Sequence, residues 1–147
     1  MKWRLIDRIE EFERWTSIRG RKTVSLEEYS LLEPLGRKGH FPESLVLECG
    51  VHLVRWLAAA SSDFEQSCTL LEVGPFVFEH ETSPGNTLTV SATVLEKQND
   101  RLEVECRVAI GSQPYAHGRL ALSLLPLKEM DLADNARTLW RELYAKA

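Results

Sequence analysis

Residues 42–60 read Pro-Glu-Ser-Leu-Val-Leu-Glu-Cys-Gly-Val-His-Leu-Val-Arg-Trp-Leu-Ala-Ala-Ala and predict one long helix that begins near Pro42. Apolar side chains occupy nearly every face of this helix, which is typical of a helix enclosed by the rest of a domain. The helix nevertheless carries Glu48 and His52, which are four positions apart and therefore share a face. Because buried acid and imidazole groups cost stability unless they are paired, they indicate either a functional site or two satisfied polar groups in a core.

The composition describes a single domain of ordinary size. The chain has 147 residues, of which 44% are hydrophobic and 27% are charged, so we expect residues 1–147 to share one core. The net charge of −4 argues against nucleic-acid binding, which requires clustered basic residues. The polar residues within 42–60 and the charged start of the chain argue against a membrane segment or a signal sequence. We therefore expect a cytoplasmic protein.

The second half of the chain predicts a series of antiparallel strands. Apolar and polar residues alternate, or short apolar runs occur, over 70–73, 76–81, 87–94, 102–110 and 115–124. Turn sequences separate these segments, namely Gly74-Pro75, 83–86, Asn99-Asp100 and 111–114.

The first half adds one or two strands between Arg4 and Val24, with Leu5, Ile9 and Ile18 as expected core contacts. Ser25 resembles the start of a short helix, and an amphipathic helix is expected over about 132–144, within a C-terminal helical extension of about 131–147. One central helix and many long strands predict an α+β fold in which the sheet wraps around the helix. Edge-to-edge association of two such sheets would cover the remaining apolar face, so we expect a homodimer.

Other sites receive little support from the sequence. Cys49, Cys68 and Cys106 have no metal-ligand spacing and are expected to be reduced core residues, and no metal site is predicted. No serine lies in a nucleophile elbow, and a thiolate is disfavoured in an apolar helix, so nucleophilic catalysis is not expected. His80 and His117 lie in predicted strands and are interpreted as structural histidines.

Three motifs carry a resemblance to a known family. Pro42-Glu-Ser-Leu-Val-Leu-Glu48, Phe76-Val-Phe-Glu79 and Pro84-Gly-Asn-Thr-Leu88 occur in the order found in the hot-dog-fold 3-hydroxyacyl-(acyl carrier protein) dehydratases, and the chain resembles a divergent member of that family. The resemblance implies a hot-dog sheet around a buried helix and a dimer. It also implies an interface tunnel for an acyl chain carried on phosphopantetheine, with acyl carrier protein as the partner and no cofactor.

The family reaction eliminates water from a 3-hydroxyacyl thioester by means of a histidine and a helix carboxylate. The resemblance assigns the carboxylate to Glu48, but the histidine is displaced. Aligning the chain on the motif 39–42, which contains His40, places the family acid at Val54, whereas aligning it on the helix pattern places the family histidine at Pro34. Either His40, delivered by a shorter loop, or His52, one turn after Glu48, is therefore the candidate second catalytic group.

The resemblance and the helix also suggest binding residues. Ser44, Gly50, Arg55 and Trp56 are the candidate substrate-binding residues, with backbone N–H groups near Ser44 available to polarise a thioester carbonyl. Arg55 is expected to reach solvent, a carboxylate such as Glu48, or a phosphopantetheine phosphate. Arg37 and Lys38 form a small basic cluster that could contact the carrier protein.

Three functions follow from these expectations. The first is a dehydratase-like lyase. The alternatives are a catalytically weak acyl-binding or subunit partner without the full dyad, and a hot-dog acyl thioesterase.

Overall fold

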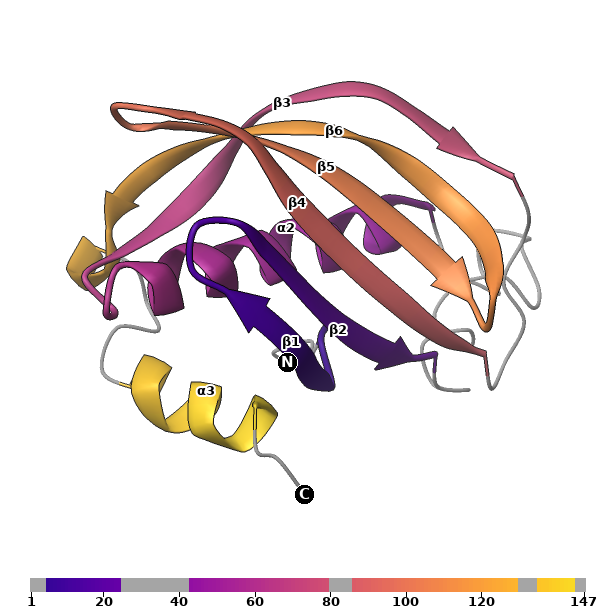
Figure 1. The fold of residues 1–147 in the computed structure, drawn as a ribbon, viewed down its shortest axis with the longest axis horizontal. Coiled ribbons are helices and arrows are strands. Elements are labelled where there is room, and N and C mark those ends of the chain that lie inside the picture. The colour runs from indigo at the N-terminus through magenta and orange to yellow at the C-terminus, as the bar shows by residue number, and fades with distance from the viewer. Residues whose placement is uncertain (1–4, 25–42, 80–85, 130–134, 145–147) are drawn as a thin grey trace, which may run out of the picture.

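The computed structural model describes residues 5–24, 43–79, 86–129 and 135–144 (Figure 1). Its elements follow the chain in this order: β1 Arg8–Glu13, β2 Ser17–Thr23, α2 Glu43–Ser61, β3 Gln66–Phe78, β4 Thr87–Gln98, β5 Arg101–Ile110, β6 Gln113–Pro126, a 3-10 turn at Leu127–Glu129, and α3 Ala136–Leu143. The predicted long helix and the three long C-terminal strands are present, and the one or two strands expected near the N-terminus are two, β1 and β2.

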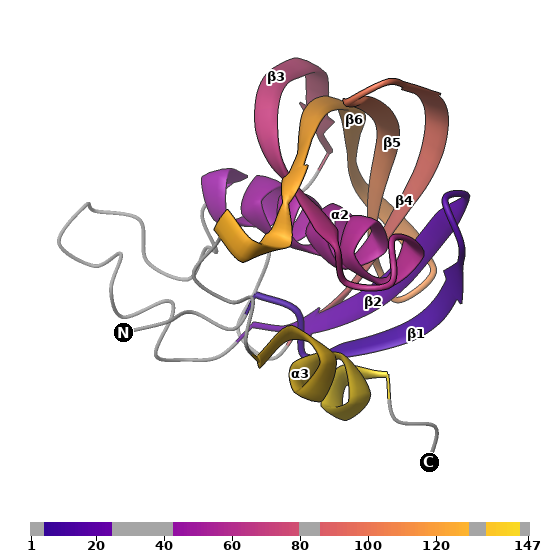
Figure 2. The same ribbon diagram turned by 90° about the vertical axis from the view of Figure 1, so that its left-hand side faces the viewer.

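The six strands form one antiparallel sheet in the order β1-β2-β4-β5-β6-β3. The sheet curves around α2, which lies on its concave side, while α3 lies beside β1 outside this curve (Figures 1 and 2). The predicted α+β architecture, with a sheet wrapped around a central helix and an additional C-terminal helix, is confirmed.

The alternation of the strands explains which face of the sheet is buried. Leu88, Val90 and Ala92 of β4 are fully buried, as are Leu102 and Val104 of β5. The polar residues between them lie on the convex face, because successive side chains of a strand point to opposite sides. The turn between these strands contains Asn99 with φ 50°, a conformation that asparagine tolerates better than most residues.

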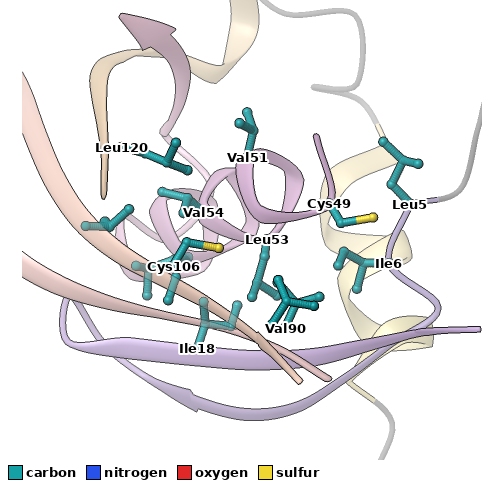
Figure 3. Packing of buried hydrophobic residues seen from close by; sticks show 14 of the residues in the cluster. Leu5, Ile6, Ile18, Cys49, Val51, Leu53, Val54, Val90, Cys106 and Leu120 are labelled. Atoms are coloured by element: carbon teal, nitrogen blue, oxygen red, sulfur yellow. The ribbon is translucent and has the colours of Figure 1, made fainter. Parts of the chain in front are cut away.

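The concave face of the sheet packs against one side of α2. Figure 3 shows Val54 directed toward Leu120 and Cys106, and Leu53 toward Val90. By length and composition α2 also resembles a membrane-spanning helix, but 56% of its apolar window is buried inside the fold, as a core helix requires.

Gly50 sets how closely α2 approaches the sheet. A Cβ atom at this position would lie 2.7 Å from Sγ of Cys106 on β5, which is closer than real Cβ contacts. Gly50 therefore faces the sheet and permits the contact between α2 and β5.

The prediction for β3 differs from the structure in extent. Gly74 and Pro75 do not separate two strands, because β3 continues through them with a register shift between Val73 and Phe76. Proline removes one ladder donor there without ending the pairing with β6. The final helix is described from Ala136 to Leu143, within the predicted range of about 132–144. The predicted short helix at Ser25, most of the turn at 83–86, and residues 130–134 lie outside the described residues.

An aromatic cluster fixes α3 against the rest of the fold. The Trp140 ring centroid lies 5.2 Å from that of Phe12 on β1 and 6.0 Å from that of Trp56 on α2, with further ring contacts to Phe64 and Tyr144. Arg137 adds an ion pair with Asp63 at 3.1 Å. The cluster thus attaches α3 to β1 and to the C-terminal part of α2.

Candidate functional site

Three polar side chains form a stripe along the partly exposed side of α2. Glu48, His52 and Arg55 are spaced by four and three positions and lie on one helix face, opposite Gly50 and Leu57, which pack into the core. The side chains of His52 and Glu48 are 31% and 43% exposed, so both groups are partly shielded but reachable. This stripe is the candidate site.

His52 lies between two groups of opposite charge. Its Nε2 is 3.8 Å from Oε2 of Glu48 and 3.5 Å from an Nη atom of Arg55. A guanidinium can only donate hydrogen bonds and a carboxylate can only accept them. The neutral imidazole with a bare Nε2 therefore suits Arg55, whereas an imidazolium with a protonated Nε2 suits Glu48.

The surroundings favour the neutral form of His52. Burial lowers its pKa below the ordinary value of 6.5, the positive charge of Arg55 lowers the pKa further, and Glu48 opposes both effects. A neutral imidazole at neutral pH can accept a proton, which is the requirement for a general base.

Arg55 is held between α2 and β3. Its Nε donates a hydrogen bond of 3.2 Å to the backbone carbonyl of Cys68, and the hydroxyl of Ser67 donates one of 3.3 Å to the backbone carbonyl of Arg55. Among the residues that the structure describes, no carboxylate forms an ion pair with Arg55, so the expected Arg55–Glu48 contact is absent from this part of the chain. The roles of Ser67 and Cys68 were not predicted, because no local sequence pattern shows which strand lies beside Arg55.

The other predicted binding residues lie in different surroundings. Ser44 is exposed in the first turn of α2, and Trp56 is half-buried against Trp140 of α3. Gly50 has a packing role against Cys106. Substrate binding by these residues and by Arg55 stays a prediction.

Of the remaining candidates, the structure describes His117. His40, Arg37 and Lys38 lie outside the described residues, as does His80, so only His52 is seen beside Glu48. His117 lies on the convex face of the sheet, where it lines a shallow depression of about 230 Å³ with Arg107 and Ser91.

The three cysteines lie in the core of the fold. Cys49, Cys68 and Cys106 are buried free thiols, as predicted, and burial raises the pKa of Cys68 and Cys106 to about 12. Within the described ranges, no group of three or more His, Cys, Asp or Glu residues is placed to hold a metal ion.

Comparison with known proteins identifies the fold. No family model and no curated protein matches the chain. Solved structures do match, among them smu.793 from Streptococcus mutans bound to acetyl-CoA, at 11% identity and a TM-score of 0.66 over 81% of this chain and 88% of that one. A hot-dog-like protein from Thermanaerovibrio acidaminovorans matches at 15% identity and a TM-score of 0.66, over 92% and 96% of the two chains.

A third structure, the thioesterase HI1161 from Haemophilus influenzae, matches at 14% identity and a TM-score of 0.64, over 84% and 80% of the two chains. At such identities the likeness shows the fold alone. The chain has the hot-dog fold, which confirms the fold expected from the resemblance. None of these three structures is described as a dehydratase, so the finer family assignment remains unsupported by them.

Proposed function

We propose that the protein is a hot-dog acyl thioesterase that hydrolyses acyl thioesters of coenzyme A or of acyl carrier protein. The observation that carries the proposal is the Glu48–His52 pair, in which a partly shielded imidazole held neutral lies 3.8 Å from a carboxylate. The substrate class is supported by similar folds described as bound to acetyl-CoA and as a thioesterase.

His52 and Glu48 perform the proton transfers of the hydrolysis. The bare Nε2 of His52 accepts a proton from a water molecule as its oxygen attacks the thioester carbonyl carbon. Glu48 then stabilises the imidazolium while the tetrahedral intermediate forms. The intermediate collapses by breaking the carbon–sulfur bond, and the departing thiolate takes the proton from His52.

Dehydration of a 3-hydroxyacyl thioester is the second candidate, since an acid and a base are both present on α2. Elimination requires one proton to leave Cα and another to reach the hydroxyl on the next carbon. Glu48 and His52 face each other through one imidazole nitrogen, an arrangement suited to handling a single proton at one position. This geometry favours hydrolysis over elimination.

The active form in this proposal is a homodimer. β3 is an edge strand of 13 residues with three exposed apolar side chains: Leu71 (54%), Val73 (41%) and Val77 (47%). A long apolar edge invites pairing with another strand, and a second copy of this chain would cover it. The acyl group would then lie between the two copies.

Release of free thiol tests the proposal. The substrates are saturated acyl-CoA thioesters of several chain lengths and the corresponding acyl carrier protein thioesters, assayed with the wild type, Glu48→Gln and His52→Gln. We expect thiol release by the wild type and a loss in kcat of about 100-fold or more in each variant. The exposed residue Glu96 and the convex-face His117 supply matched controls, Glu96→Gln and His117→Gln, which should retain wild-type rates.

The alternatives give different results in the same assay. Formation of a 2-enoyl product with an intact thioester would support the lyase. Binding of acyl-CoA without turnover would support the acyl-binding protein. Either result would contradict the thioesterase proposal.

A further inference from the structure

Arg55 is a half-buried cation whose donors are only partly used by the described residues. Its Nε is bonded to the Cys68 carbonyl at 3.2 Å, and one Nη atom lies 3.5 Å from Nε2 of His52. A guanidinium has five N–H donors in a fixed plane, so further donors remain for an acceptor outside this set. Charge-assisted pairs with carboxylate or phosphate are the interactions for which this geometry is best suited.

Protonation of His52 would add a second positive charge to the site, beside that of Arg55. An imidazolium would place a second positive charge 3.5 Å from the guanidinium, while Glu48, at 3.8 Å from His52, supplies a single negative charge for both. A second anion at Arg55 would balance the site at the moment when His52 carries the proton. The binding of this anion and the protonation of His52 are therefore thermodynamically linked.

We propose that Arg55 binds an oxyanion carried by the substrate, a carboxylate at the end of a short acyl group, and thereby allows His52 to accept its proton. This inference rests on the proposed hydrolysis and narrows its substrate class to thioesters that carry an anionic group. Arg55 acts as both a substrate-binding residue and a positioning residue for His52.

Nuclear magnetic resonance of the His52 ring tests the anion site without turnover, with the resonance assigned by its loss in His52→Gln. Among the described residues, the titratable and charged groups around His52 and Arg55 are Glu48 on α2 and the Cys68 thiol on β3. The thiol remains neutral because burial raises its pKa to about 12. We expect succinate or inorganic phosphate, compared with chloride at equal ionic strength, to raise the pKa of His52 in the wild type.

Substitutions at Arg55 complete the test. In Arg55→Gln the pKa of His52 should rise without any anion, and added succinate or phosphate should have no further effect. Arg55→Lys should retain part of the response because the charge is kept. The exposed Arg141 on α3 provides the control Arg141→Gln, which should respond as the wild type does. A His52 resonance that is insensitive to both anions in the wild type would overturn the proposal.

Kinetics then identify the source of the anion, using succinyl and butyryl thioesters of coenzyme A and of N-acetylcysteamine, which lacks phosphate. If Arg55 binds a carboxylate, Arg55→Gln should lower kcat/KM by about 10- to 100-fold for the succinyl thioesters of both carriers. A loss that occurs with both coenzyme A thioesters and with neither N-acetylcysteamine thioester would show that Arg55 binds a phosphate instead, and it would overturn the proposal. Equal kcat/KM of the wild type and Arg55→Gln on all four substrates would overturn the proposal. An anion response of His52 in a protein that hydrolyses none of them would keep the anion site and remove the hydrolase function.

Discussion

Replacing Gly50 with alanine tests the packing that holds the candidate site in place. A methyl group at position 50 would lie 2.7 Å from Sγ of Cys106, whereas such atoms pack at about 3.5–4.0 Å. α2 and β5 must then separate by about 1 Å, or the fully buried Cys106 side chain must move. Overpacking of this kind costs about 1–3 kcal/mol. Alanine regains about 1 kcal/mol over glycine inside a helix, so Gly50→Ala should lower the free energy of unfolding by about 0–2 kcal/mol.

The double variant isolates the clash from the change in helix propensity. Cys106→Ala removes the sulfur atom that the new methyl group would meet. In that background Gly50→Ala should become neutral or stabilising by up to about 1 kcal/mol. The coupling free energy between the two substitutions should therefore be about 1–3 kcal/mol.

Urea unfolding followed by tryptophan fluorescence measures all four proteins of this cycle. With a slope of about 2 kcal/mol/M, a coupling of about 2 kcal/mol appears as about 1 M in the combined midpoints. Gly111→Ala is the control, since its φ of 61° strains alanine but nothing lies within 4 Å of its Cβ, so it should not couple to Cys106→Ala. If the effects of Gly50→Ala and Cys106→Ala add to within about 0.5 kcal/mol, the packing argument is refuted. If Gly50→Ala instead lowers substrate affinity and leaves the free energy of unfolding unchanged, the predicted binding role of Gly50 is supported.

Four further predictions concern single features of the fold. His52 has a lower pKa in the folded protein than in the unfolded chain, so below pH 6.5 the unfolded chain binds its proton more readily. The free energy of unfolding should therefore decrease as the pH falls from 6.5 through the pKa of folded His52. His52→Gln should remove this part of the decrease, as measured by urea unfolding at several pH values. Cys68 and Cys106, with pKa values raised to about 12, should resist iodoacetamide at pH 8 until urea unfolds the protein, and native-state alkylation at the rate of an exposed thiol would contradict their burial. Trp140→Ala should lower the free energy of unfolding by about 2 kcal/mol, less than for a fully buried tryptophan because the ring is half-exposed, and an unchanged urea midpoint would show that α3 is not anchored by this ring. Val77→Lys, which adds a charge to the open edge of β3, should convert the proposed dimer to a monomer in analytical ultracentrifugation. A wild type that is already monomeric, or a variant that remains dimeric, would contradict an interface at this edge.

The parts of the fold that the sequence predicted well are those governed by a repeating pattern. The alternation over 87–94 and 102–110 placed β4 and β5, because period-two burial is a local property of a strand. The turn predicted at Gly74 and Pro75 was wrong, because β3 pairs with β6 on both sides of these residues and this pairing overrides their local preference for a turn. Boundaries such as the start of β3, at Gln66 rather than at residue 70, depend on packing that a local pattern does not contain.

The candidate site divides in the same way. The spacing of Glu48 and His52 predicted that they share a helix face, and the structure places their polar atoms 3.8 Å apart. The partner of Arg55 could not be predicted, since the Cys68 carbonyl reaches it through the packing of β3 on α2. Helix geometry also places Gly50 opposite Glu48, a signal that was available in the sequence and that argues for packing rather than substrate contact.

The products formed from a 3-hydroxyacyl-CoA thioester test the central claim most directly, because this one substrate can undergo either hydrolysis or dehydration. Mass spectrometry with the wild type and Glu48→Gln measures both products in one reaction. We expect equal amounts of free coenzyme A and 3-hydroxy acid with the wild type, and about 100-fold less of both with the variant. Accumulation of 2-enoyl-CoA with its carbon–sulfur bond intact would contradict the central claim.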